Sequence, residues 1–243
     1  MPSDSLPIFN QIWRETLHWE PTKSQLEQWE KLYQEIILVN RKINLTRITK
    51  PKDFWEKHLW DSLAGIDAKI IDIKSCSKVI DIGTGAGFPG IPVATIYPHL
   101  QVTLLDSKIK KIKCIDFILD KLKFNNCQTL IARSETIGQM KEYRETYDLV
   151  LIRAVGTPSV CTEYALPLLK IGGIAVLYRG YWHDEDKLTL KSALEKLGGK
   201  IISIKNIETP LTQSIRNFIY IKKISTTSLK FPRQIGIPTQ NPL

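Results

Sequence analysis

A glycine-rich segment carries residues suited to holding a nucleotide-like ligand. Residues 79–92 read VIDIGTGAGFPGIP, with an apolar run before the glycines and an apolar segment after them. Glycine lets the backbone turn tightly and lets a ligand approach closely. Gly85, Gly87 and Gly90 satisfy the GxGxxG pattern of dinucleotide enzymes, whereas Gly83, Gly85 and Gly87 satisfy the GxGxG pattern of S-adenosylmethionine enzymes. The glycines alone leave both cofactors open.

Acidic residues around the glycines favour S-adenosylmethionine. Asp81 lies two residues before the first glycine. A carboxylate there would repel a pyrophosphate but attract the ammonium and sulfonium groups of S-adenosylmethionine. Asp106 ends the next apolar run, where it can accept hydrogen bonds from both ribose hydroxyls of either cofactor. Ser134 and Glu135 follow the third apolar run, so we expect them beside the adenine.

Seven short apolar runs, alternating with helix-forming segments, must position these residues. The runs cover residues 78–82, 102–105, 128–132, 149–152, 174–178, 201–204 and 217–221. Strands that alternate with helices predict an α/β fold with a mostly parallel, doubly wound, Rossmann-like sheet. A short polar connection containing Pro210 joins the last two runs and predicts a terminal antiparallel hairpin, which is common in the class I methyltransferase version of this fold.

The chain divides into three predicted regions: a helical extension over 1–70, a methyltransferase-like domain over 71–226, and a basic, proline-containing tail over 227–243. Five of the six tryptophans lie in the first 60 residues, and we interpret most of them as anchors that pack the extension onto the domain. We expect the tail to be extended or mobile, with an RNA clamp and a solvated tail as equal alternatives.

The N-terminus lacks the basic and apolar regions of a signal peptide, and no apolar stretch is long enough to span a bilayer. These features predict a soluble, cytoplasmic protein that does not act at a membrane. The formal net charge of +9 favours a polyanionic partner.

Three arginines lie just past the third, fourth and fifth predicted strands: Arg133, Arg153 and Arg179. Ligands of open α/β sheets bind beyond the carboxyl ends of the strands, and arginine presents a planar fork suited to phosphate and to guanine edges. The three positions therefore predict an anionic substrate along this rim. In contrast, the sequence shows neither a nucleophile–histidine arrangement nor a cluster of metal ligands.

Several of these motifs together resemble one family, the bacterial small-subunit (16S) ribosomal RNA guanine-N7 methyltransferases known as RsmG or GidB. The matching stretches are NLT at 44–46, HxxDS at 58–62, DxGTGxGxPGIP at 81–92, LLDS at 104–107, RxE at 133–135 and RA at 153–154. They run in order over most of the chain, and the long glycine–proline string is far more specific than a lone GxGxxG.

The resemblance implies that S-adenosylmethionine is the cofactor and that a monomeric enzyme acts on ribosomal RNA or on the small subunit. The residues it places at or beside the cofactor are Gly83, Phe88, Asp106, Ser107, Lys108, Ser134, Glu135 and Arg153. We expect Arg133 and Arg179 to contact RNA. The family commonly has Lys-Gly after the fifth strand where this chain has Arg179-Gly180, so the positive charge is kept but the donor geometry differs.

Guanine N7 carries no proton, so methylation there needs positioning of the reactants and no general base. Our hypothesis gives Arg153 the task of orienting the target guanine or the methionine part of the cofactor. His58 and Asp61 stand three residues apart on a predicted helix, and a structural hydrogen bond there is favoured over contact with cofactor or guanine. A nicotinamide-dependent oxidoreductase and a non-catalytic RNA-binding module stay open as alternatives.

Overall fold

A computed structural model describes residues 5–243, and within them seven strands form one sheet in the order β3-β2-β1-β4-β5-β7-β6. The strands are β1 (Lys78–Ile82), β2 (Gln101–Asp106), β3 (Cys127–Ile131), β4 (Tyr147–Arg153), β5 (Leu169–Arg179), β6 (Gly199–Glu208) and β7 (Ile215–Lys223). Strands β1 to β5 pair in parallel, whereas β7 is antiparallel to both β5 and β6. The predicted mostly parallel sheet with a terminal antiparallel hairpin is confirmed.

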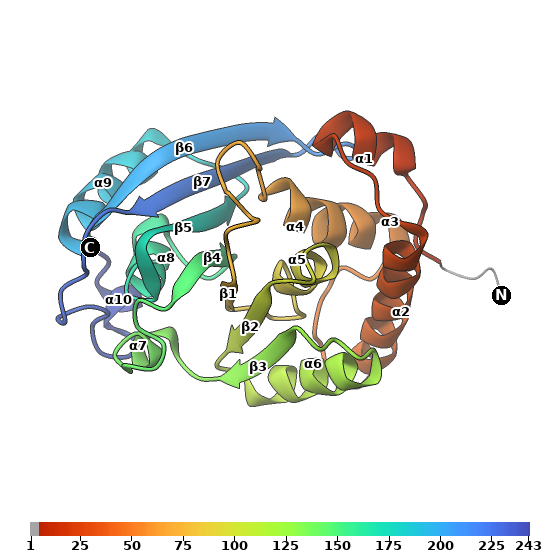
Figure 1. Cartoon of the computed structure of the whole chain (residues 1–243), viewed down its shortest axis with the longest axis horizontal. Coiled ribbons are helices and arrows are strands. Elements are labelled where there is room, and N and C mark those ends of the chain that lie inside the picture. The colour runs from red at the N-terminus through yellow and green to blue at the C-terminus, as the bar shows by residue number, and fades with distance from the viewer. Residues whose placement is uncertain (1–4) are drawn as a thin grey trace.

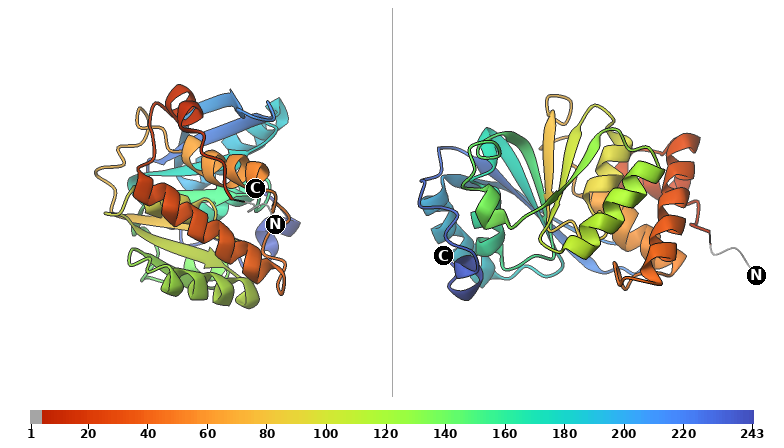
Figure 2. Two further views of the ribbon diagram at one scale, coloured as in Figure 1. Left: turned by 90° about the vertical axis from the view of Figure 1, so that its right-hand side faces the viewer. Right: turned by 90° about the horizontal axis from the view of Figure 1, so that it is seen from below.

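Helices pack on both faces of this sheet (Figures 1 and 2). Those before β2 are α1 (Asn10–Leu17), α2 (Lys23–Asn40), α3 (Pro51–Phe54), the π-helical segment η1 (Trp55–Trp60), α4 (Asp61–Ala64) and α5 (Gly90–Ile96). Those after β2 are α6 (Ile109–Lys121), α7 (Ser134–Ile137), α8 (Pro158–Ala165), α9 (Asp184–Leu197) and α10 (Ile237–Gln240). In residues 5–243, none of them is long and apolar enough to cross a membrane.

Successive side chains along each central strand alternate between two separate hydrophobic cores, one on each face of the sheet. In β1, Val79 joins the core beneath α5 and α6, whereas Ile80 and Ile82 join the core beneath α8 and α9. This period of two is what a strand buried on both faces requires. Because β1, β2, β4 and β5 run parallel, their carboxyl ends lie at the same edge of the sheet.

The N-terminal helices belong to the first of these cores. Four tryptophans are almost fully buried there: Trp13, Trp29, Trp55 and Trp60. The rings of Trp13 and Trp55 meet edge to face at a centroid distance of 4.9 Å, a favourable geometry for aromatic pairs. Helix α2 crosses the outer side of α5 and α6 (Figure 2, left). The interpretation of these tryptophans as anchors is confirmed, and the helices are continuous with the core of the sheet.

The C-terminal tail, expected to be extended or mobile, is packed against α7 and α8 through hydrogen bonds and an ion pair. Arg144 donates hydrogen bonds to four backbone carbonyls, three of which lie in the tail. The guanidinium of Arg233 donates to both carboxylate oxygens of Glu163, with distances of 2.9 Å for Nε–Oε1 and 2.6 Å for Nη2–Oε2. The side chain of Glu163 is fully buried. These partners lie far apart in the sequence, and no local sequence pattern predicts their contacts.

Removing the cation from this pair tests how firmly the tail is anchored. Arg233→Ala leaves the buried Glu163 carboxylate without its guanidinium, and we expect the free energy of unfolding to fall by about 3 kcal/mol. Lys230→Ala, at an exposed tail position, is the matched control and should stay within about 0.5 kcal/mol of the wild type. Chemical denaturation of the three proteins measures both values. Equal stability of the two variants would contradict the anchored tail.

Candidate functional site

The glycine loop leaves β1 at Ile82 and turns under β2. Gly83, Gly85 and Gly87 all adopt positive φ, at 70°, 59° and 92°, a backbone region open to glycine and unfavourable for most other residues. The N–H of Gly83 donates to the carbonyl of Leu105 at 2.8 Å. A Cβ on Gly83 would lie 2.5 Å from the side chain of Val155, so the loop and the segment after β4 approach too closely for any larger residue.

Asp81 holds this loop from the inside. Its fully buried carboxylate accepts hydrogen bonds at Oδ2 from the Thr84 hydroxyl at 2.6 Å and from the Gly90 N–H at 2.8 Å. The other oxygen, Oδ1, is buried without a hydrogen-bond partner in residues 5–243. Burial raises the pKa of Asp81 to about 6, although the bonds from Thr84 and Gly90 act in the opposite direction. Asp81 therefore sits behind the loop, and its contact with a cofactor stays a prediction.

Asp106 ties the loop to the end of β2. Its Oδ2 accepts a hydrogen bond from the Gly85 N–H at 3.1 Å, and its Oδ1 accepts one from the Lys108 N–H at 2.9 Å. Asp106 and Ser107 are half-buried and Lys108 is exposed. The three predicted residues thus form one turn beside the glycine loop, with the carboxylate at its centre.

Ser134 and Glu135 begin α7, and both are buried. The Oε1 atom of Glu135 accepts hydrogen bonds from the Tyr164 hydroxyl at 3.2 Å and from the Gly236 N–H at 3.1 Å. The residue predicted to lie beside adenine is therefore also a contact point for the tail. Sequence reasoning missed Tyr164 and Gly236, since neither belongs to a motif around Glu135.

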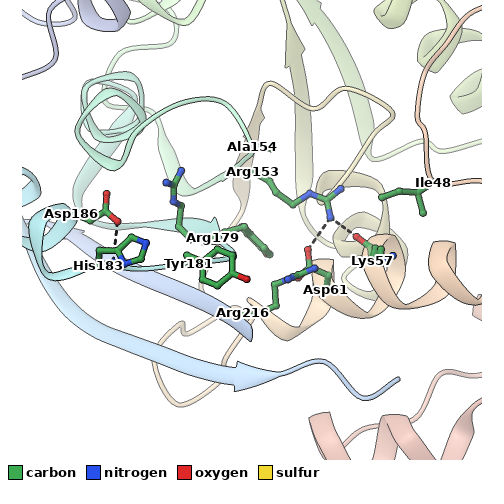
Figure 3. A pocket seen from close by; sticks show the side chains of 12 residues that line it. Ile48, Lys57, Asp61, Arg153, Ala154, Arg179, Tyr181, His183, Asp186 and Arg216 are labelled. Atoms are coloured by element: carbon green, nitrogen blue, oxygen red, sulfur yellow. Dashed lines mark hydrogen bonds and ion pairs between the residues drawn. The ribbon is translucent and has the colours of Figure 1, made fainter. Parts of the chain in front are cut away.

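Arg153 ends β4 and reaches across to the N-terminal helices (Figure 3). Its Nη1 donates to Asp61 Oδ2 at 2.9 Å and to the Lys57 carbonyl at 2.7 Å. Its Nη2 lies 3.2 Å from Nδ1 of His58. The guanidinium also lies 6.0 Å from the ring centroid of Phe88, close enough for a cation–π contact. Arg153 is thereby fixed between the helical segment and the glycine loop.

His58 contacts Arg153 and Thr46 as a neutral imidazole. Burial, with the neighbouring Arg153 charge, lowers the pKa of His58 well below its usual value. Because arginine is always a donor, Nδ1 accepts from Arg153, and the ring proton on Nε2 then points to the Thr46 hydroxyl at 3.0 Å. The ring stacks on Phe88 with centroids 4.2 Å apart. His58 and Asp61 thus meet through Arg153, a link that their spacing on one helix does not suggest.

Asp61 also binds a second arginine. Its Oδ1 accepts a hydrogen bond from Arg216 Nε at 3.1 Å, so one buried carboxylate lies between two guanidinium groups. Beside it opens a pocket of about 660 Å³ (Figure 3). The pocket is lined by Ile48, Lys57, Asp61, Arg153, Ala154, Tyr178, Arg179, Gly180, Tyr181, His183, Asp186 and Arg216. The sequence did not predict Arg216 at this site, because it is the hairpin that brings β7 beside β5.

Of the three arginines predicted to lie along one rim, only two line the same pocket. Arg153 and Arg179 line the same pocket, as expected from the adjacent carboxyl ends of β4 and β5. Arg133 is exposed and precedes α7 beyond the end of β3, and it does not belong to this lining. The sheet order places β2 and β1 between β3 and β4, which separates Arg133 from the other two.

Comparison with known proteins places the chain in a family. The family model described as GidB, rRNA small subunit methyltransferase G, matches residues 25–218. The chain belongs to the GidB family. It is 52% identical over 241 residues to the ribosomal RNA small subunit methyltransferase G of Trichormus variabilis, covering 98% of each chain. The protein of the same name from Trichodesmium erythraeum is 54% identical over 98% of this chain and 94% of its own length.

Solved structures support the fold independently. A predicted O-methyltransferase from Agrobacterium tumefaciens matches 69% of this chain and 81% of its own with a TM-score of 0.52 and 20% identity. The fibrillarin pre-rRNA processing protein of Methanococcus jannaschii matches 68% and 74% with a TM-score of 0.53 and 18% identity. The Rossmann-like methyltransferase fold is thus confirmed. Of the three functions that the sequence left open, membership of the GidB family favours the methyltransferase, which requires a methyl donor.

The buried carboxyl of Asp81 should give this protein a distinctive pH dependence. The pKa of Asp81 is raised from the ordinary 3.8 to about 6. The contribution of this carboxyl to the stability of the folded protein is therefore fully present below about pH 4 and is lost as the pH rises through 6. We expect the free energy of unfolding of the wild type to fall by about 2 kcal/mol relative to Asp81→Asn between pH 4 and pH 7, because the carboxyl of the unfolded chain is already more than half ionised at pH 4. Denaturant titrations at several pH values measure the difference. Parallel pH profiles would contradict this assignment.

Proposed function

We propose that this protein transfers a methyl group from S-adenosylmethionine to N7 of one guanine in small-subunit (16S) ribosomal RNA. The observation that carries the proposal is the match of residues 25–218 to the GidB family, which contains the motif residues that surround the glycine loop. The resemblance of those motifs to guanine-N7 enzymes supports the choice of acceptor atom.

The residues present suit S-adenosylmethionine. A Cβ on Gly85 would make ordinary van der Waals contact, at 3.9 Å, with the Gly83 carbonyl oxygen and the Lys111 Nζ, so no close packing fills the space next to this glycine. The buried Asp81, with one unpartnered oxygen, supplies negative charge behind the loop, which favours a cationic ligand over a pyrophosphate. Asp106, at the end of β2, would accept hydrogen bonds from the ribose, and Glu135 with Ser134 would border the adenine. Ser107, Lys108 and Phe88 would complete the surroundings of the cofactor.

The chain's own part in the reaction is to position the reactants. S-adenosylmethionine, when bound, supplies a methyl group activated by its sulfonium. Because guanine N7 has a free lone pair, no residue needs to remove a proton, which agrees with a neutral His58 engaged at both ring nitrogens. Arg153, held by Asp61 and His58, would orient the guanine or the carboxylate of the cofactor. Fixed orientation of this kind is a large source of rate acceleration.

The RNA would be bound by positive charge along the edge of the sheet. We assign Arg179, in the pocket, and Arg133, at the start of α7, to contacts with the RNA. The formal net charge of +9 supports a polyanionic substrate. We further propose that the protein acts in the cytoplasm as a monomer, with a methyltransferase domain over 71–226 completed by the helices before it and the tail after it.

The direct test is transfer of radiolabelled methyl groups to small ribosomal subunits that lack the N7 modification, followed by chain cleavage at 7-methylguanine. Label at a single guanine is the expected result. A protein that binds S-adenosylhomocysteine yet labels no guanine would retain the cofactor assignment and refute the proposed acceptor. A protein that is stabilised by NAD and not by S-adenosylhomocysteine would refute the cofactor assignment itself.

Arg153 offers the sharpest mutational test of positioning. We expect Arg153→Ala to lower kcat for methyl transfer by about 100-fold or more, because the aligned contact is lost. Arg153→Lys keeps the charge but not the planar fork, so it should recover only a small part of the rate. Circular dichroism and thermal unfolding serve as the control for folding. Near-normal kcat in a folded Arg153→Ala protein would rule out this role.

A further inference from the structure

We propose that the pocket beside Arg153 holds the target nucleotide of the RNA, turned out of its stack, with the base against Tyr181 and a phosphate between Arg179 and Arg216. This inference rests on the proposed function and names the part of the molecule that recognises the substrate. Four observations carry it: the position of the pocket, its charge, its exposed aromatic ring, and the shape of the RNA itself.

The pocket shares a wall with the glycine loop. Ala154 lines the pocket, and the next residue, Val155, lies against Gly83 on the other side of the same segment. Ala154 adopts a left-handed φ of 56°, which is unfavourable for a residue with a side chain. Arg179 fixes the segment by donating to the Gly156 carbonyl at 2.7 Å. Only the segment of Ala154 and Val155 would therefore separate a base in the pocket from the proposed cofactor site.

The charge of the pocket favours an anion. Three arginines, Arg153, Arg179 and Arg216, line the pocket with two carboxylates, Asp61 and Asp186, which leaves one positive charge in excess. Arg179 forms no ion pair within residues 5–243, and its buried Nε has no hydrogen-bond partner there. The Nζ of Lys57 is paired with Asp53 outside the pocket at 2.6 Å. The guanidinium groups of Arg179 and Arg216 are thus the ones available to meet a phosphate.

An exposed aromatic ring lies at the mouth of the same pocket. The residue Tyr181 is 75% exposed and stacks on His183 with a centroid distance of 6.3 Å and an interplanar angle of 11°. Figure 3 shows the ring of Tyr181 between Arg179 and Arg216. Aromatic rings beside arginines are the usual means of binding unstacked bases, since every base has a flat face to stack.

The shape of RNA explains why the nucleotide must leave its stack. Guanine N7 lies in the major groove, which is deep and narrow in A-form RNA and which side chains do not reach. Enzymes that modify a base therefore act on single-stranded RNA or turn the nucleotide outwards into a pocket. A volume of about 660 Å³ lies within the roughly 300–1,000 Å³ of small-molecule sites. It is sufficient for one nucleotide.

The test compares binding of a short, guanine-containing single-stranded RNA by fluorescence anisotropy. Tyr181→Ala should weaken binding about 10-fold through lost stacking, and Tyr181→Trp should restore it. Leu188→Ala, a control at a residue that is 71% exposed on α9 and outside the pocket lining, should bind as the wild type does. Measuring RNA affinity at several salt concentrations separates the ionic contact from the stacking contact. Arg179→Gln should reduce the slope of log affinity against log salt concentration by about 0.7, whereas Tyr181→Ala should leave that slope unchanged.

The outcomes distinguish this inference from the proposed function. RNA affinity that is equal in Tyr181→Ala and the wild type, or an absence of wild-type binding, would overturn the inference, even if methyl transfer to small subunits is intact. Absence of methyl transfer by the wild type would overturn the proposed function, and the RNA-binding series would still decide whether Tyr181 stacks on a base. Unchanged affinity for S-adenosylhomocysteine in all variants is expected, and its loss in Tyr181→Ala would also count against the assignment.

Discussion

The site depends on a single buried carboxylate, that of Asp61, held between Arg153 and Arg216 at 2.9 and 3.1 Å. It joins three segments that are distant in the sequence: the start of α4, the end of β4 and the start of β7. Burying a carboxylate carries a large desolvation penalty, which close guanidinium partners can offset. Removing Asp61 would leave two neighbouring guanidinium groups without their shared counter-charge, and removing either arginine would break one side of the link, so the geometry of the three segments is mutually fixed.

One consequence is that the N-terminal helices are part of the site. They supply Asp61, the Lys57 carbonyl and His58, and these hold Arg153 toward the glycine loop. The stacked rings of His58 and Phe88 join the same helical segment to the loop. The glycine loop and the proposed nucleotide pocket thus lie on two sides of one fixed arginine. Such preorganisation suits a reaction that requires alignment and no proton transfer.

The sequence predicts the sheet well and the side-chain network poorly. Residues 78–82 form β1 as expected, because alternating strands and helices leave a strong local pattern. The family motifs also locate the glycine loop and Asp106. By contrast, the bond from Arg216 to Asp61 spans 155 residues and follows from the hairpin alone. The anchored tail depends in the same way on Arg144 and Glu163, whose partners no local spacing reveals.

The central claim is that Asp61 is a positioning residue that acts through Arg153, and a double-mutant cycle on kcat for methyl transfer tests it most directly. Asp61→Asn and Arg153→Ala are measured singly and together. If Asp61 acts only through Arg153, the double variant should be no slower than Arg153→Ala alone, with a coupling energy above about 1 kcal/mol. Independent effects that multiply in the double variant would contradict the account and show that Asp61 serves the reaction by another route.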